Sequence, residues 1–90
     1  LLVNDTELVV IEVKTTCRPQ YVDDLTEKVK EFKAFFPQYK NYKSYGALAA
    51  LKYEGASDKY AYRNGFFVIK ATGEGMMEII NDHDFVPVAY

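Results

Sequence analysis

The chain has 90 residues, of which 49% are hydrophobic, and its formal net charge is −2. This length gives one small domain with a single core, and the interspersed charges are unlike those of a strongly basic nucleic-acid-binding module. The single cysteine, Cys17, cannot form an internal disulfide, and no apolar stretch approaches the length of a membrane span. We therefore expect a cytoplasmic protein without a membrane partner.

The first residues, LLVNDTELVVIEVK, read as a hairpin of two apolar strands. The turn contains the segment NDT, and Asn and Asp both tolerate the left-handed conformations of tight turns. A turn centred on residues 5 and 6 places Val3 opposite Leu8, and Glu12 opposite a position upstream of Leu1. Because the chain enters directly in a strand and without a methionine, we interpret residues 1–90 as a single domain that lacks its N-terminal portion.

Residues 19–36 have the period of an amphipathic helix, with apolar residues at steps of three and four. Asp24 and Glu27 have the spacing of a capping box, whereas Pro19 is compatible with an earlier first turn. Pro37 marks the end of the helix, because proline cannot continue it. The expected buried stripe consists of Val22, Leu25, Val29, Phe32 and Phe36.

The segment NYKSYGALAALKY, residues 41–53, has apolar or small residues at both alternating positions. A strand that is buried on both faces belongs to a sheet with helices above and below it. The small residues favour close packing of a helix against this strand.

The segment ASDKYAYRNG permits two interpretations. Ser57 and Gly65 have the positions of a helix cap and a helix end, whereas Asn64-Gly65 is also a hairpin signal. We favour the helix, followed by a strand at FFVIK, a turn at ATGEG, a strand at MMEII and an irregular tail. The order strand, strand, helix, strand, helix, strand, strand predicts an α/β fold with a mixed central sheet flanked by helices.

Glu12 and Lys14 interrupt the apolar strand two positions apart. Alternation along a strand places both side chains on one face and Val13 on the other, with about 7 Å between the two α-carbons. A carboxylate at the edge of a core needs a partner, and a divalent cation is one. A neighbouring lysine can position a water molecule or hold a phosphate oxygen. A carboxylate, a metal ion and a lysine together suggest phosphodiester hydrolysis. The simpler interpretation is a surface ion pair that contributes under about 1 kcal/mol.

The segment Glu12-Val13-Lys14, after a hydrophobic hairpin and before a helix and a two-sided strand, resembles the PD-(D/E)XK (restriction-endonuclease-like) nuclease superfamily. VVIEVKTT, FKAFFPQYKNYKSYGALAAL and YAYRNGFFVIK are similar to an uncharacterised group of small prokaryotic proteins assigned to it. The resemblance implies a restriction-endonuclease-like core, with Glu12 and the Val13 carbonyl as Mg²⁺ ligands and Lys14 positioning the attacking water. The family's aspartate on the preceding strand has no counterpart, since Asp5 lies at the turn, about 23 Å from Glu12 along an extended strand.

The leading hypothesis is therefore a Mg²⁺-dependent endonuclease that cleaves nucleic acid, with Glu12 and Lys14 as catalytic residues. The alternative is a catalytically inactive nuclease-like module for self-association, as a homodimer, or for binding another partner. A tyrosine-rich composition, a low net charge and an exposed strand edge suit this alternative.

Four other groups of residues have simpler structural interpretations. The consecutive residues of NDHDF favour a solvated turn over a metal site. Tyr60 and Tyr62, followed by Arg63, have helical spacing, which favours core packing over stacking on bases. Cys17 has no adjacent histidine, so packing is favoured over a nucleophilic role. The solvated face of the first helix is expected to carry Lys28, Lys30 and Lys33.

Overall fold

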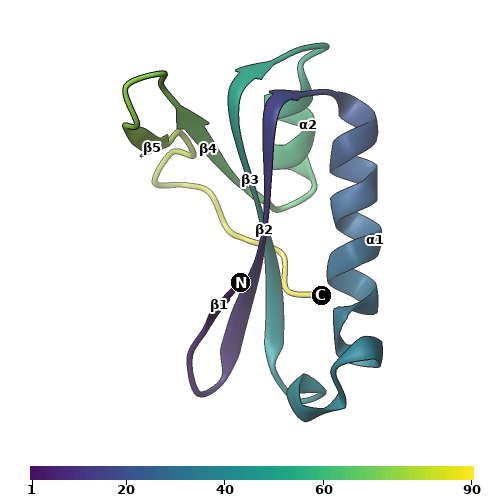
Figure 1. The fold of residues 1–90 in the computed structure, drawn as a ribbon. Helices are drawn as coiled ribbons and strands as arrows, with labels where there is room; N and C mark the ends of the chain where they lie inside the picture. The colour runs from purple at the N-terminus through teal and green to yellow at the C-terminus, as the bar shows by residue number, and fades with distance from the viewer.

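The computed structural model describes all residues from Leu1 to Tyr90 and combines a five-stranded sheet with two α-helices (Figure 1). The predicted order of strands and helices is confirmed, with one additional 3-10 turn. The elements are β1 (Leu2–Val3), β2 (Glu7–Cys17), α1 (Pro19–Phe35), η1 (Pro37–Tyr39), β3 (Lys43–Tyr53), α2 (Ser57–Arg63), β4 (Phe67–Ala71) and β5 (Met77–Ile79).

The sheet is mixed and has the strand order β1-β2-β3-β4-β5. Strands β2, β3 and β4 are parallel, whereas β1 and β5 run antiparallel to their neighbours. The crossovers through α1 and α2 advance in the same direction across the sheet, so right-handed connections place both helices on one face. Figure 1 shows both helices on that face. The expectation of helices above and below the sheet is therefore wrong, while the α/β class with a mixed sheet is confirmed.

The hydrophobic core lies between the two helices and the face of the sheet that they cover, which we call the inner face. From α1 it receives Val22, Leu25 and Val29, as the apolar stripe predicted. Phe32 is only half-buried and Phe36 is exposed, because the helix ends at Phe35 and its last turn extends beyond the core. The core cluster consists of Cys17, Val22, Leu25, Val29, Leu48, Ala50, Ala61, Phe66 and Val68.

Helix α1 begins earlier than a capping box would place it. Its first residue is Pro19, which suits the first turn because the missing N–H would have no intrahelical acceptor there. Arg18 is the N-cap residue and no side chain caps the helix. The capping box at Asp24 and Glu27 is therefore wrong, whereas the earlier start and the stop before Pro37 are confirmed.

We call the face of the sheet opposite the helices the open face. The packing on this face shows why the sequence of β3 has the pattern of a strand buried on both sides. Ala47 and Ala49 lie on it and are buried although no helix covers them. Ala47 pairs with Ile11 on one side and Phe67 on the other, so larger side chains flank its short methyl group. Small residues on a central strand can therefore be buried by their neighbours in the sheet.

The segment after β3 forms a helix, as favoured, rather than a hairpin at Asn64-Gly65. Ala56, with φ 54°, occupies the N-cap position in a left-handed conformation. Ser57 is fully buried and does not cap the helix; its hydroxyl donates instead to the Cys17 carbonyl at 3.0 Å. Gly65 follows the helix with φ 81°, which suits a residue without a β-carbon. The cap prediction at Ser57 is therefore wrong, and this residue ties α2 to the end of β2.

The last ten residues are irregular, as expected, but they are held in place by side chains. The Asn81 amide replaces a strand partner of β4: its oxygen accepts from Val68 N–H at 2.6 Å and its nitrogen donates to the Phe66 carbonyl at 3.1 Å. At the end of the chain, Tyr90 N–H donates to the Ser44 carbonyl at 2.7 Å. The tail thus links β4 to the start of β3. No helix of the protein has the length and apolar character needed to cross a bilayer.

Candidate functional site

Glu12 and Lys14 lie on the same face of β2, as predicted, and this is the inner face, toward α1. Lys14 Nζ is 3.5 Å from one carboxylate oxygen of Glu12, and Lys28 Nζ from α1 is 3.0 Å from the other. The Glu12 side chain is 23% exposed, compared with 35% for Lys14 and 54% for Lys28. The carboxylate is therefore held between two ammonium groups at the edge of the core.

A catalytic pair should line a concave surface, and the surface around Glu12 and Lys14 is hollowed only in part. Lys14 Nζ lies 4.6 Å from the centre of the Tyr21 ring, a cation–π contact that directs it along α1. Lys14 and Val13 border a cavity of about 200 Å³, and Glu12 does not border it. Val13 lies on the other face of the strand, as alternation predicts, and its side chain is 69% exposed there because no helix covers the open face.

The outer edge of β2, away from β3, is largely without a partner. β1 pairs only with Leu8 and Val9, so the strand from Val10 onward has no neighbour on this side. Asn4 N–H donates to the Glu7 carbonyl across the hairpin at 3.0 Å. Antiparallel hydrogen-bonded pairs recur at every second residue, so the odd-numbered residues of β2 direct their backbone groups toward this edge.

The charges around Glu12 do not suit a divalent cation. One carboxylate and two ammonium groups sum to a positive cluster, which repels Mg²⁺, and Mg²⁺ sites in proteins use carboxylate and other oxygen ligands. The structure contains no group of three or more His, Cys, Asp or Glu side chains placed to hold a metal ion. The residues of this chain by themselves therefore do not fit the Mg²⁺ site that the resemblance implies.

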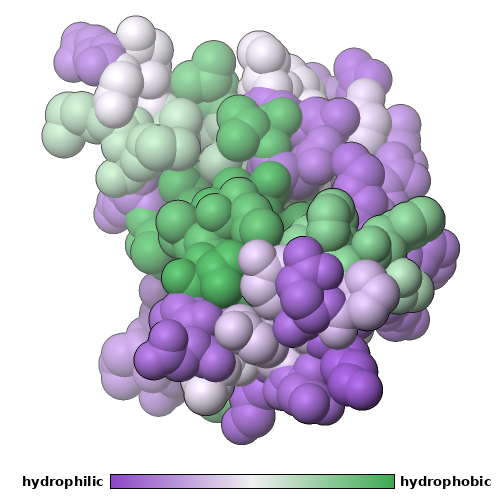
Figure 2. Space-filling view, turned by 60° about the horizontal axis from the view of Figure 1, so that its bottom comes forward, coloured by the Kyte–Doolittle hydropathy of each residue, from purple (hydrophilic) through white to green (hydrophobic).

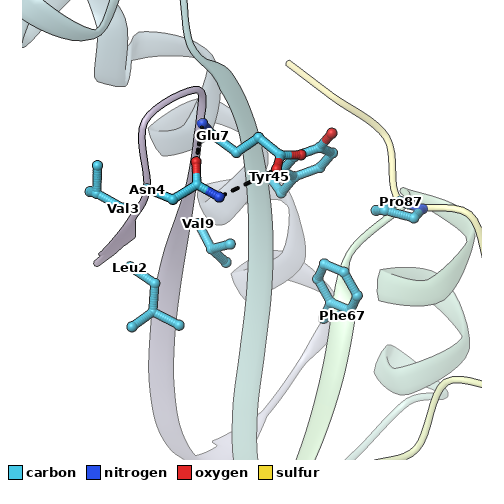
Figure 3. Close-up of a pocket in the computed structure, with 8 residues that line it drawn as sticks. All are labelled: Leu2, Val3, Asn4, Glu7, Val9, Tyr45, Phe67 and Pro87. Atoms are coloured by element: carbon cyan, nitrogen blue, oxygen red, sulfur yellow. Dashed lines mark hydrogen bonds between the residues drawn. The ribbon is translucent and has the colours of Figure 1, made fainter.

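An apolar groove beside β1 has its polar end already occupied by a hydrogen-bonded pair. It measures about 350 Å³ and lies between the hairpin, β3, β4 and the tail (Figure 3). At one end, the Asn4 side chain donates to the Glu7 carboxylate at 3.4 Å and accepts from Glu7 N–H at 2.7 Å. Burial, and then the neighbouring Glu7 carboxylate, raise the pKa of Tyr45. The remaining lining is mainly apolar: Leu2, Val3, Val9, Phe67 and Pro87.

Large hydrophobic side chains are exposed on the open face of the sheet. In the view of Figure 2, toward the lower end of Figure 1, a hydrophobic area also lies near the middle, with hydrophilic residues around it. Val13, Leu51, Met77 and Ile79 are among the large hydrophobic residues that remain exposed in the protein. Exposed apolar patches of this kind mark interaction surfaces in soluble proteins.

The other candidate residues have structural roles. The hydroxyls of Tyr60 and Tyr62 donate to Asp23 and Asp82, at 2.5 Å and 2.7 Å, and each carboxylate raises the pKa of the tyrosine bound to it. Cys17 is fully buried, and burial raises the pKa of its thiol, which disfavours a nucleophile. The side chains of His83 and Asp84 are solvated, as the interpretation of NDHDF as a turn predicted.

Sequence reasoning did not identify Lys28 as a partner of Glu12. It placed Lys28 on the solvated face of α1, and the side chain is indeed more than half exposed. The available signal was its position three residues after Leu25 and next to Val29, at the border of the buried stripe. A residue at that border reaches the strand that the helix covers.

Comparison with the models of known protein families, with curated proteins and with solved structures gives no match.

Proposed function

We propose that this chain is a catalytically silent, nuclease-like module that acts by association with another protein chain. A restriction-endonuclease-like arrangement is supported by the order of a hairpin, the Glu12-Val13-Lys14 strand, a helix and a parallel strand. The observation that carries the proposal is the pairing of the Glu12 carboxylate with Lys14 and Lys28. This pairing neutralises the group that a nuclease would use to bind its metal ion.

The association part of the proposal is supported by the open face of the sheet. The large hydrophobic side chains of Val13, Leu51, Met77 and Ile79 are exposed there. Exposed apolar patches of this kind mark interaction surfaces in soluble proteins.

The second candidate is Mg²⁺-dependent hydrolysis of phosphodiester bonds in nucleic acid. It is favoured by the placement of Glu12 and Lys14 on one face, next to an edge where a further strand could add a second carboxylate. In this candidate Glu12, the Val13 carbonyl and Lys14 keep the roles that the resemblance implies.

Cleavage of single-stranded, duplex and branched DNA with and without Mg²⁺ distinguishes the two candidates. The parent protein, Glu12→Gln and Lys14→Met are compared, with Glu31→Gln as the control for loss of an exposed glutamate on α1. We expect no Mg²⁺-dependent cleavage above the level of Glu12→Gln. Cleavage that requires Mg²⁺, survives in Glu31→Gln and is lost in Glu12→Gln would establish the nuclease candidate and exclude the silent module.

A further inference from the structure

We propose that a cavity between α2 and β4 binds a small ligand that carries an oxyanion, a carboxylate or a phosphate, on an aromatic ring. The cavity measures about 350 Å³ and shares no residue with the charged cluster around Glu12 or with the exposed patch of the open face. The inference is therefore independent of the proposed function. From α2 the cavity is bordered by Asp58, Lys59, Tyr62 and Arg63.

Two positive charges of α2 border this cavity without a partner. Lys59 and Arg63 are four residues apart, so they lie one turn apart on the same side of the helix. Both are exposed, and neither takes part in an ion pair of the protein. Like charges at this spacing repel each other, and a bound oxyanion would relieve the repulsion. With the single carboxylate of Asp58, the two positive charges give the lining a net charge of +1, which favours an anion.

Two sides of the cavity are fixed by contacts within the protein. On one side, the Asn81 amide accepts from the Val68 N–H at 2.6 Å. On the other, the Tyr62 hydroxyl donates to Asp82 at 2.7 Å, and the Tyr62 ring lies 5.0 Å from the ring of Phe85. A cavity whose sides are already ordered loses little conformational entropy when a ligand enters it.

The chemistry of the lining selects an aromatic anion. The fully buried Val68 and the partly exposed Ile80 supply an apolar surface, while the polar side chains of the fixed sides are already hydrogen-bonded. A guanidinium such as that of Arg63 binds a carboxylate or phosphate through parallel N–H groups and stacks on aromatic rings, and Lys59 adds a second charge. The volume is near the lower limit of small-molecule sites, which suits a single ring with one anionic group.

The experiment follows the amide chemical shifts of isotope-labelled protein during titration with phenyl phosphate or with benzoate. We expect at least one of these probes to bind with a Kd of about 1 mM and to shift the amides of α2, Ile80 and Asn81. The tighter probe identifies the anionic group. Phenol lacks the anion and inorganic phosphate lacks the ring, so each should bind about tenfold or more weakly than the tighter probe.

Charge variants test the roles of the two cations. Lys59→Gln and Arg63→Gln each remove one positive charge and should raise the Kd of the tighter probe about fivefold or more. Asp58→Asn removes the opposing charge and should lower this Kd. Lys40→Gln changes an exposed lysine at the end of η1 and is the matched control, so its Kd should equal that of the parent.

Circular dichroism confirms that each variant is folded. Four results would each overturn the proposed site. They are no binding of either probe up to about 20 mM, shifts that fall outside the cavity, phenol or inorganic phosphate binding as tightly as the better probe, and Arg63→Gln binding as tightly as Lys40→Gln.

Discussion

Replacing Gly46 by alanine tests the packing of the core at its closest point. A β-carbon at this position of β3 would lie 2.6 and 2.7 Å from two ring atoms of Phe66, and 3.3 Å from a methyl group of Val29. Ordinary contacts begin at 3.4 Å, so the Phe66 ring would have to retreat by about 0.8 Å. Phe66 and Val29 are both fully buried, so neither can move into solvent. Overpacking of this kind costs about 1–3 kcal/mol of unfolding free energy.

Thermal and urea denaturation, followed by circular dichroism, measure this cost. For a domain of this size, about 1–3 kcal/mol corresponds to a fall in Tm of about 5–20 °C. Gly73→Ala is the matched control, because a β-carbon there meets no atom within 4 Å and the residue has no positive φ. A Gly46→Ala protein as stable as Gly73→Ala would show that Phe66 does not pack against β3 as described.

Three further predictions concern buried or half-buried side chains. Ser57→Ala should cost about 0.5–1.5 kcal/mol, because the buried Cys17 carbonyl loses the Ser57 hydroxyl but keeps the backbone N–H of Glu54 at 2.9 Å. Ser44→Ala should cost less or stabilise, because the buried Ser44 hydroxyl has no protein partner; urea denaturation compares the two variants. Burial raises the pKa of the Tyr53 hydroxyl to about 12, above its value near 10 in the unfolded chain. The neutral hydroxyl therefore contributes its full stabilisation below pH 10, and about 2–3 kcal/mol of unfolding free energy is lost as the pH rises toward 12. Tyr53→Phe should therefore lose stability less steeply over this range, and an equal slope would contradict the burial of the hydroxyl. Phe32→Ala should cost about 1–3 kcal/mol by thermal melting, below the 3–5 expected for a fully buried phenylalanine, because Phe32 is only half-buried.

The parts of the fold that could be predicted from the sequence are those fixed by local chemistry. The hairpin register, with Val3 opposite Leu8, follows from a short turn that contains Asn and Asp. The buried residues of α1 follow from their helical period, and its end follows from Pro37. Each of these features depends on residues close in sequence, so a short stretch of chain is enough to specify it.

The parts that could not be predicted depend on contacts between distant segments. The sequence around Ala47 is the same whether a helix covers this residue or the larger side chains of the neighbouring strands bury it. The sequence therefore could not show that both helices lie on one face of the sheet. Cys17 shares its parity with the exposed Val13, yet it is buried in the core cluster, where the start of α2 lies against the end of β2. Besides Lys14, Glu12 pairs with Lys28, sixteen residues later, and only the packing of α1 on β2 reveals this second partner.

The residue opposite Glu12 on the outer edge of β2 determines which chemistry the site can support. The hairpin register places the second residue before Leu1 across from Glu12 when β1 is extended by an added strand. An aspartate at this position would have its α-carbon about 4.5 Å from the α-carbon of Glu12, as in other non-hydrogen-bonded antiparallel pairs. Its carboxylate would bring the net charge of the cluster with Glu12, Lys14 and Lys28 to zero. We expect such an extended protein to bind Mg²⁺ about tenfold or more tightly than a matched extension with asparagine, as measured by calorimetry. Equal Mg²⁺ affinity in the two proteins would mean that Glu12 cannot take part in a metal site.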